Sequence, residues 1–375
     1  MVFVKSKKFS FILVGRVISR GLLGVFFLVF AVLLEPEQYG NLGYLISIAG
    51  TFAVVSRFGL SDSVIVYHAK NPLLANQVNV LVVITISLAS IILLTIDVFA
   101  AFLCLATSLC IMNMHNQIGL KEYKKFFWLQ LSKGILIIIL PISLYFFFEL
   151  QGILIGMSIA YILHSFNFIK RIKFVMPSQL IKKNFKVLIN NFGVDLSGRL
   201  GKFVDKLLIA PLFGFAVLGI YQLNVQVLFT LEMVPIALHS FLLSEESSGK
   251  KHKKISLFVL CASVIIVVAI IIFSPFVIST FLPKYIEGIP SLQIIIIALI
   301  PLTLSAIFRA KLQSAESTKV GYSIIIRIGS LLGLITLLGN QYGLIGISYA
   351  ILISSFLYTA FLFYLYRLEK SKIIL

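Results

Sequence analysis

The chain has 375 residues, of which 59% are hydrophobic and only 12% are charged, and its mean hydropathy is +1.06. A soluble domain of this size could not bury so much apolar surface, so the composition excludes a water-soluble globular protein and indicates an integral membrane protein. The formal net charge of +18 would suggest a nucleic-acid partner in a soluble protein, but the positions of the charges give another explanation.

The apolar segments predict an all-α protein. The N-terminus is basic and then apolar and lacks a small-residue cleavage site, so we expect it to remain as the first membrane helix. Apolar windows of about 20 residues predict about twelve spans in all. They are expected at 10–34, 40–60, 78–96, 98–118, 126–148, 151–169, 187–211, 214–243, 256–282, 288–310, 320–339 and 343–366.

The connections between these spans alternate in charge. One set is rich in Lys and Arg and includes 121–125, 170–186 and 250–254, together with both termini. The other set is short and acidic or neutral, and Lys284 is its only cation. The positive-inside rule therefore predicts a multi-pass protein of the cell membrane with both termini in the cytoplasm. Its cations face the cytoplasmic membrane surface, so no nucleic-acid partner is needed.

The longest basic connection, at about 170–186, divides the spans into two sets of six. Because six spans return the chain to the same side, the two halves would be parallel repeats. Both halves begin with a Gly-Arg pair and later carry a Gly and a Tyr within three residues: Gly15-Arg16 with Tyr39-Gly40, and Gly198-Arg199 with Gly219-Ile220-Tyr221. We expect an N-terminal bundle at 1–175 and a C-terminal bundle at 176–375, around a central cationic cavity.

Charged side chains inside the spans are the main functional signal, because each costs about 2.5–3.5 kcal/mol at a helix centre. The seventh span carries one polar stripe, formed by Asp195, Arg199, Lys202 and Lys206. Asp205 lies at the edge of this stripe. Such a stripe cannot face lipid. It either lines a polar transport cavity or forms a buried seam of ion pairs, Asp195 with Arg199 and Lys202 with Asp205.

Other spans contain cations of two kinds. Arg16 and Arg20 lie one turn apart in the first span, and Arg327 lies in the eleventh, so these three are candidates for function. Three more lie near the cytoplasmic ends of their spans and are expected to extend to the interface: Arg57, Lys133 and Arg309. The fourth span ends in the polar motif MNMHNQ, in which His115 is either an interfacial histidine or a proton relay.

A cationic interior suits an anionic substrate, because phosphate and carboxylate groups stabilise buried Arg and Lys. The chain has no GxxxxGK[ST] loop, so we expect no ATP hydrolysis. Its outer connections are too short for an extracytoplasmic catalytic domain. The residues therefore predict a transporter with no enzymatic activity and no cofactor.

Three segments resemble the polysaccharide flippases, the O-antigen transporter type within the multidrug/oligosaccharidyl-lipid/polysaccharide exporter superfamily. The first, from Gly15 to Ala69, contains LEPEQYG and closes its second helix on FGLS. Residues 199–230 are similar to the seventh and eighth helices of that family, and 281–302 to its ninth-to-tenth connection. The order and spacing of the segments extend the resemblance over nearly the whole chain.

The resemblance implies a flippase that moves a polyprenyl-(pyro)phosphate-linked sugar or oligosaccharide from the cytoplasmic to the outer leaflet by alternating access, for surface polysaccharide biosynthesis. Five cations match cavity positions of the family and would hold the pyrophosphate and sugar: Arg16, Arg20, Arg57, Arg199 and Lys202. Lys206 and Arg327 are added to the substrate-binding candidates because they are also cations within spans. Asp195 and Asp205 are the candidates for sensing a coupling proton or sodium ion.

The chain departs from the family pattern in two places. Many relatives have fourteen helices, whereas twelve are predicted here, and some place a Pro after the eighth helix, near HSFLLSEESSG of this chain. A drug or metabolite exporter of the same superfamily is the nearest alternative, although it would usually carry buried acids. A membrane glycan polymerase is a further alternative, but polymerases commonly have a large outer loop.

Overall fold

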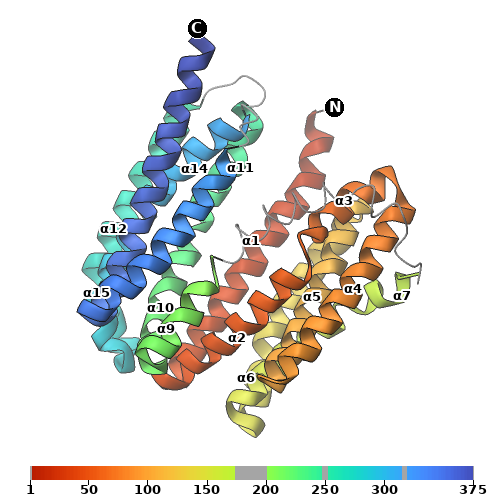
Figure 1. The fold of residues 1–375 in the computed structure, drawn as a ribbon, viewed down its shortest axis with the longest axis horizontal. Helices are drawn as coiled ribbons and strands as arrows, with labels where there is room; N and C mark the ends of the chain where they lie inside the picture. Colours follow the sequence, from red (N-terminus) through yellow and green to blue (C-terminus); the bar gives the residue numbers. More distant parts are fainter. Residues whose placement is uncertain (1, 174–200, 247–251, 315–318, 375) are drawn as a thin grey trace. The chain divides into compact units, whose positions relative to one another are not determined.

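The computed structural model describes residues 2–173, 201–246, 252–314 and 319–374, and all regular structure in these ranges is helical (Figure 1). The expected all-α fold class is therefore confirmed. The first part of the chain forms α1 (Val2–Leu33), α2 (Pro36–Ser56), α3 (Leu60–Lys70), α4 (Pro72–Leu94), α5 (Val98–Gly119), α6 (Tyr123–Leu163) and α7 (Phe166–Arg171). The second part forms α9 (Val204–Phe213), α10 (Phe215–Leu231), α11 (Met233–Glu246), α12 (Lys253–Phe281), η1 (Pro283–Gly288), α13 (Ile289–Ile297), α14 (Leu299–Ser314) and α15 (Val320–Ile374).

Nine helical segments in the described ranges are long and apolar enough to cross a membrane. Two of them are hairpins of two spans, because α6 breaks at Glu149 (φ 49°) and α15 breaks at Gly343 (φ 57°). The halves fold back on each other at small residues, where a Cβ on Gly152 would meet the Leu144 carbonyl and one on Gly346 would meet that of Leu338. These breaks coincide with the expected gaps between 148 and 151 and between 339 and 343.

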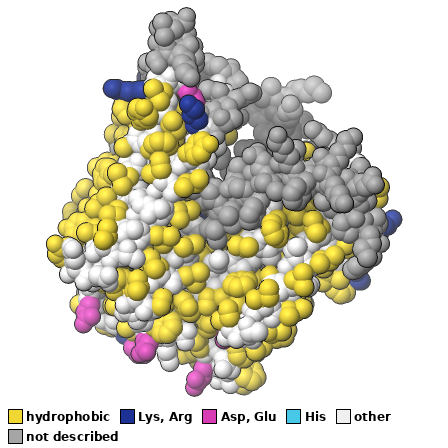
Figure 2. Space-filling model, in the orientation of Figure 1, with side chains coloured by type: hydrophobic (Ala, Val, Ile, Leu, Met, Phe, Trp, Pro, Cys, Tyr) yellow, Lys and Arg dark blue, Asp and Glu magenta, His cyan; other side chains and the backbone are white. Residues whose placement is uncertain are grey.

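The remaining expected span, 187–211, is described only from Gly201 onward. The other predicted spans correspond to single helices or to helices in line, such as α10 with α11 and α13 with α14. The outer surface carries many large apolar side chains, including Phe147 (78% exposed) and Phe258 (73% exposed). Figure 2 shows such side chains over most of the visible described face, as expected of a surface in contact with lipid acyl chains.

The chain divides into two compact units, which we name unit 1 (Met1–Phe26 and Leu42–Leu207) and unit 2 (Phe27–Asn41 and Leu208–Leu375). Unit 2 contains the end of α1 and the start of α2, whereas the rest of both helices belongs to unit 1. A division at a single chain position does not describe this arrangement. The predicted boundary between residues 175 and 176 falls outside the described residues and stays a prediction.

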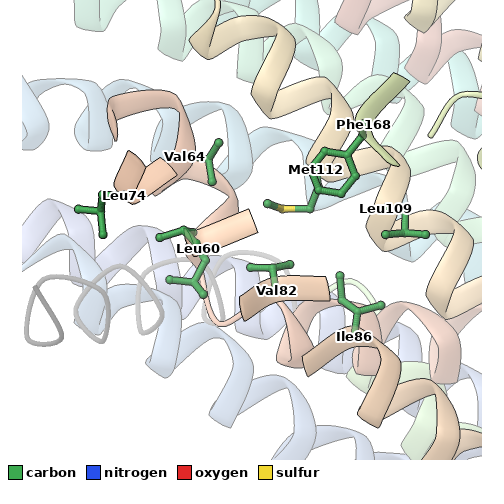
Figure 3. Packing of buried hydrophobic residues seen from close by; sticks show 9 residues of the cluster. Leu60, Val64, Leu74, Val82, Ile86, Leu109, Met112 and Phe168 are labelled. Carbon is green, nitrogen blue, oxygen red and sulfur yellow. The ribbon is translucent and has the colours of Figure 1, made fainter. Parts of the chain in front are cut away.

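Unit 1 has an apolar core shared by four helices (Figure 3). Leu60 and Val64 of α3 pack against Val82 and Ile86 of α4, and residues of α5 and α7 complete the cluster: Leu109, Met112 and Phe168. Both long helices that enter this core have capped starts. Asn71 Oδ1 accepts the Leu74 N–H at 3.2 Å, and Asp97 Oδ1 accepts the Ala100 N–H at 2.7 Å.

In unit 2, α14 packs against α11 and α15 (Figure 1). The short helix α13 packs against α10, α12 and α15. In the span formed by η1, α13 and α14, 67% of the most apolar stretch is buried inside the protein, so this span is the central element of the unit. Its position is fixed by polar side chains as well as apolar ones. Asn224 of α10 donates to the Gly288 carbonyl and to Ser291 Oγ at 3.0 Å each, and Ser291 and Ser348 hydroxyls lie 2.7 Å apart. Such hydrogen bonds join helices in a membrane, where apolar burial supplies little driving force.

Candidate functional site

The polar stripe of the seventh span is only partly described. Asp195 and Arg199 lie outside the described residues, whereas Lys202 is exposed just before α9, and Asp205 and Lys206 lie in its first turn. The side chains of Asp205 and Lys206 are 3% and 5% exposed, so the stripe contains both an accessible and a buried cation.

Asp205 and Lys206 form a buried ion pair in unit 1. Lys206 Nζ lies 3.3 Å from Asp205 Oδ1, which also accepts the Lys206 backbone N–H at 2.9 Å. The same ammonium group donates to the Lys202 carbonyl at 2.7 Å. The sequence suggested Lys202 as the partner of Asp205 at a three-residue spacing, and it did not identify the adjacent Lys206. Pairing reduces the cost of burying both charges, which would otherwise be several kcal/mol for each.

Arg16 and Arg20 are both exposed on α1. The opposite side of α1 packs on α6, where Gly15 lies against Phe127 and Gly134 leaves room for Leu22. The candidate span begins at Val14, so Arg20 lies about 9 Å along the helix axis from its start. At this depth an exposed guanidinium group needs water or a polar partner, because contact with acyl chains alone is too costly.

Arg57 is 1% exposed and lies inside unit 1. Its Nη1 donates to Ser108 Oγ of α5 at 3.2 Å. The expectation that Arg57 extends to the membrane interface is therefore wrong. The chain ends α2 with a left-handed turn at Phe58 (φ 48°) and Gly59 (φ 64°), and α3 then packs back onto α4 and α5. Arg57 thus lies at the end of α2, as hydropathy predicted, but its side chain is buried inside unit 1.

Arg327 of α15 has a defined environment in unit 2. Its Nη2 lies 3.4 Å from Glu232 Oε1, at the junction of α10 and α11, and its guanidinium carbon lies 5.5 Å from the Tyr358 ring centre. The Arg327 side chain is 34% exposed and that of Glu232 is 13% exposed. An arginine held by a carboxylate and an aromatic face can still present its remaining donors to an anion. The sequence singled out Arg327 but gave no basis for pairing it with Glu232.

A polar network in unit 1 was not identified from the sequence beyond its MNMHNQ motif. The side-chain amides of Asn79 and Asn116 donate to each other at 2.9 and 3.0 Å, and His68 Nε2 lies 2.5 Å from Asn116 Oδ1. A cavity of about 60 Å³ adjoins these groups, lined also by Asn76 and Asn113. Polar groups packed in this way link α3, α4 and α5.

His115, the candidate proton relay, lies at the same end of α5. Its Nε2 is 3.1 Å from Asp62 Oδ1, and its Nδ1 is 2.8 Å from the Ile111 carbonyl oxygen. Asp62 is exposed, so this pair lies at the edge of unit 1. Among the described residues no group of three or more His, Cys, Asp or Glu side chains could hold a metal ion.

The fold is that of membrane transporters of the multidrug/oligosaccharidyl-lipid/polysaccharide exporter superfamily. Residues 6–118 match the family model described as polysaccharide biosynthesis protein. Structurally, the chain resembles the lipid II flippase MurJ in an inward closed conformation, with a TM-score of 0.75, 19% identity, and coverage of 94% of this chain and 86% of that one. The suspected resemblance is thus confirmed in sequence for the first third of the chain and in fold for nearly all of it.

Two further solved structures share the fold. A multidrug resistance MATE family transporter in an inward-facing conformation matches with a TM-score of 0.70 and 16% identity, over 94% of this chain and 95% of that one. A superfamily transporter from Pyrococcus furiosus, whose binding pocket is described as having reverse polarity, matches with a TM-score of 0.59 and 17% identity, over 97% and 96% of the two chains. No curated protein sequence matches this chain.

Proposed function

We propose that this protein moves a polyprenyl-(pyro)phosphate-linked sugar or oligosaccharide from the cytoplasmic to the outer leaflet of the cell membrane, as a step in making a surface polysaccharide. The observation that carries the proposal is the pair Arg16 and Arg20, exposed one turn apart on an otherwise apolar span. Two guanidinium groups at that spacing match the charge and the donor geometry that a diphosphate requires. The match of residues 6–118 to a polysaccharide biosynthesis family supports the same substrate class.

The predicted site residues differ in what they can do. Arg16, Arg20 and Lys202 are exposed, so they can contact a substrate directly. Arg57 and Lys206 are buried and hydrogen-bonded, so we assign them to fixing the end of α2 on α5 and the start of α9. Arg199 belongs to the same stripe by sequence and is assigned with Lys202, and Arg327 is proposed as a substrate-binding cation of unit 2.

The chemistry requires no covalent step. The diphosphate would bind the arginines, the sugar would lie in the polar environment, and the polyprenyl tail would stay among the acyl chains. A site that opens to one leaflet and then to the other would move the head group across the membrane. Asp205 is proposed to couple this cycle to a proton or sodium ion, together with Asp195, because a change in its charge would alter its pairing with Lys206.

The experiment that tests the proposal measures lipid-linked glycans in cells that lack the gene. Wild-type protein should relieve the cytoplasmic accumulation of polyprenyl-linked sugar, and Arg20→Ala should not. A charged hydrogen bond contributes about 1.5–3 kcal/mol, so transport should fall roughly 10- to 100-fold. Arg20→Lys should keep part of the activity, and Lys254→Gln, which removes an exposed cation at the start of α12, should keep all of it.

Drug susceptibility of the same cells separates the proposal from its main competitor. Unchanged lipid-linked glycans in the deletion strain, together with raised drug sensitivity, would replace the flippase assignment by a drug exporter. Separately, Asp205→Asn in proteoliposomes should remove the dependence of transport on the ion gradient. Transport that still follows the gradient after this substitution would rule out Asp205 as the coupling group.

A further inference from the structure

A groove of about 690 Å³ lies at the junction of α5 and α6 in unit 1, and none of the proposed substrate arginines lines it. The loop between these helices and the first turns of α6 form its wall, and Asn167 of α7 lies at its rim. By the distribution of Lys and Arg, this junction lies on the cytoplasmic side of the membrane. A groove at the cytoplasmic ends of two membrane helices is within reach of phospholipid head groups.

The groove carries a surplus of positive charge. Its one acid, Glu122, is already bound by Lys125 at 2.9 Å and by Arg171 at 3.1 Å. Lys121 and Lys124 are exposed lining residues, and neither has an ion-pair partner within the described chain. Two ammonium groups are therefore available to an anion.

The backbone at Lys121 is strained, with φ at 61°. Its N–H donates to the Ile118 carbonyl at 3.0 Å, and the next N–H, of Glu122, donates to the Gln117 carbonyl at 2.9 Å. Glycine would occupy this left-handed position at no steric cost, whereas lysine costs about 1 kcal/mol there. The turn thus holds a lysine where the backbone alone favours glycine.

The groove also contains a buried acceptor without a donor. Gln117 is 1% exposed and its Oε1 has no hydrogen-bond partner, although its amide nitrogen donates to Asn113 Oδ1 at 3.4 Å. A buried polar atom left unpaired costs about 1–3 kcal/mol. A hydroxyl group on an occupant of the groove would remove this cost once the Gln117 side chain rotates toward the groove.

The rest of the groove is apolar and aromatic. Trp128 is 56% exposed, and Leu129 and Tyr123 lie beside it. Tryptophan and tyrosine are typical of the membrane interface, where one side of the ring contacts acyl chains and the other contacts head groups. This lining would follow the first part of an acyl chain.

We propose that the groove binds an anionic phospholipid with a hydroxylated head group, of the phosphatidylglycerol class. The phosphate lies between Lys121 and Lys124, and the glycerol ester region lies along Trp128. A head-group hydroxyl donates to Gln117 Oε1 after that side chain rotates toward the groove. Basic pockets at the cytoplasmic ends of membrane helices suit such head groups. The bound lipid would be a structural or regulatory ligand and not the molecule that is transported.

Trp128 is the only tryptophan in the chain, so its fluorescence reports on this groove alone. The test places the purified full-length protein in phosphatidylcholine vesicles that contain brominated phosphatidylglycerol or, at the same mole fraction, brominated phosphatidylcholine. Bromine quenches tryptophan on contact, so the ratio of quenching gives the relative binding constant of the two lipids. We expect a preference of roughly tenfold for phosphatidylglycerol, since each lysine near an anionic lipid contributes about fivefold before screening by salt.

The double variant Lys121→Gln, Lys124→Gln should reduce this preference to about one. The matched control, Lys254→Gln with Lys319→Gln, removes the same charge from two exposed lysines elsewhere and should keep the preference. All four lysines are on the surface, so an unchanged elution profile will verify that the variants are folded. Gln117→Leu should weaken binding of phosphatidylglycerol more than that of phosphatidylcholine.

Three results would overturn the proposal. Equal quenching by both lipids in the wild-type protein would show that the groove does not select anionic lipid, and a preference that survives in the double variant would place the anion site elsewhere. Polyprenyl diphosphate added at low mole fraction provides a third arm. If it displaces phosphatidylglycerol from Trp128, the groove belongs to the transported substrate and the phospholipid assignment fails.

Discussion

The crossing of α2 and α10 in unit 2 gives the most direct test of the described packing. At this crossing, a Cβ on Gly219 would collide with the Pro36 carbonyl and lie 3.1 Å from the Gly40 nitrogen. A Cβ on Gly40 would collide in the same way with the Phe215 carbonyl. These neighbours are backbone atoms that cannot rotate away, so Gly219→Ala must separate the two helices.

The expected cost of Gly219→Ala is about 1–3 kcal/mol, the usual range for overpacking a closely packed site. Gly333→Ala in α15 is the matched control, because nothing lies within 4 Å of its added Cβ. Alanine is favoured over glycine inside a helix by about 0.5–1 kcal/mol, so the control should be neutral or slightly stabilising. The helix-propensity gain is common to both variants, so their free energies of unfolding, measured by SDS titration in mixed micelles, should differ by the overpacking cost of about 1–3 kcal/mol. Equal stability would refute the close approach of α2 and α10.

Three other substitutions test the polar contacts. Asn116→Leu should lower the free energy of unfolding by about 2–4 kcal/mol in the same titration, because Asn79 loses both of its hydrogen bonds to Asn116. The control is Asn167→Leu at an exposed position. If Asn116→Leu lowers the free energy of unfolding by less than this control does, the network is contradicted. Glu122→Gln should reduce the acid sensitivity of stability. Burial acts to raise the pKa of Glu122, but hydrogen bonds and charges from its two cations outweigh this and lower it, so its stabilisation is present at neutral pH and is lost as the pH falls through that lowered pKa. The effect should stay below about 1 kcal/mol because the site is partly exposed, and identical pH profiles for wild type and variant would count against it. Glu232→Gln should release Arg327 and slow transport. The free energy of unfolding should change by about 1 kcal/mol or less. A loss of stability above about 3 kcal/mol would show that the Glu232–Arg327 pair mainly stabilises the fold.

The spans could be predicted from the sequence because the cost of polar groups in lipid imposes a simple pattern on composition. The gaps expected after residues 148 and 339 coincide with the breaks of α6 and α15 at Glu149 and Gly343. What the pattern could not give is their geometry. Each break is a single residue with positive φ inside an otherwise continuous helix, and hydropathy does not report φ.

The candidate site was harder to predict, because a charge in a span gives no information about its partner. The sequence separated Arg20 from Arg57 by depth in the span and expected Arg57 at the interface, yet Arg20 is exposed and Arg57 is 1% exposed inside unit 1. Their difference depends on how α3 packs on α5, which involves residues far apart in the chain. The same is true of Arg327 and Glu232, which are 95 residues apart.

Accessibility, and not charge alone, therefore separates the roles that these cations can have. A cation that is buried and paired, such as Lys206, has already exchanged its hydration for protein contacts, and breaking them to bind a substrate would cost several kcal/mol. The side chain of an arginine exposed on a span can be reached by a phosphate without opening a buried ion pair. The same reasoning applies at the α5–α6 junction, where Glu122 engages Lys125 and Arg171 but leaves Lys121 and Lys124 on the surface. Two anion sites with different roles can thus exist in unit 1, one in a span for a head group in transit and one at the interface for a resident lipid.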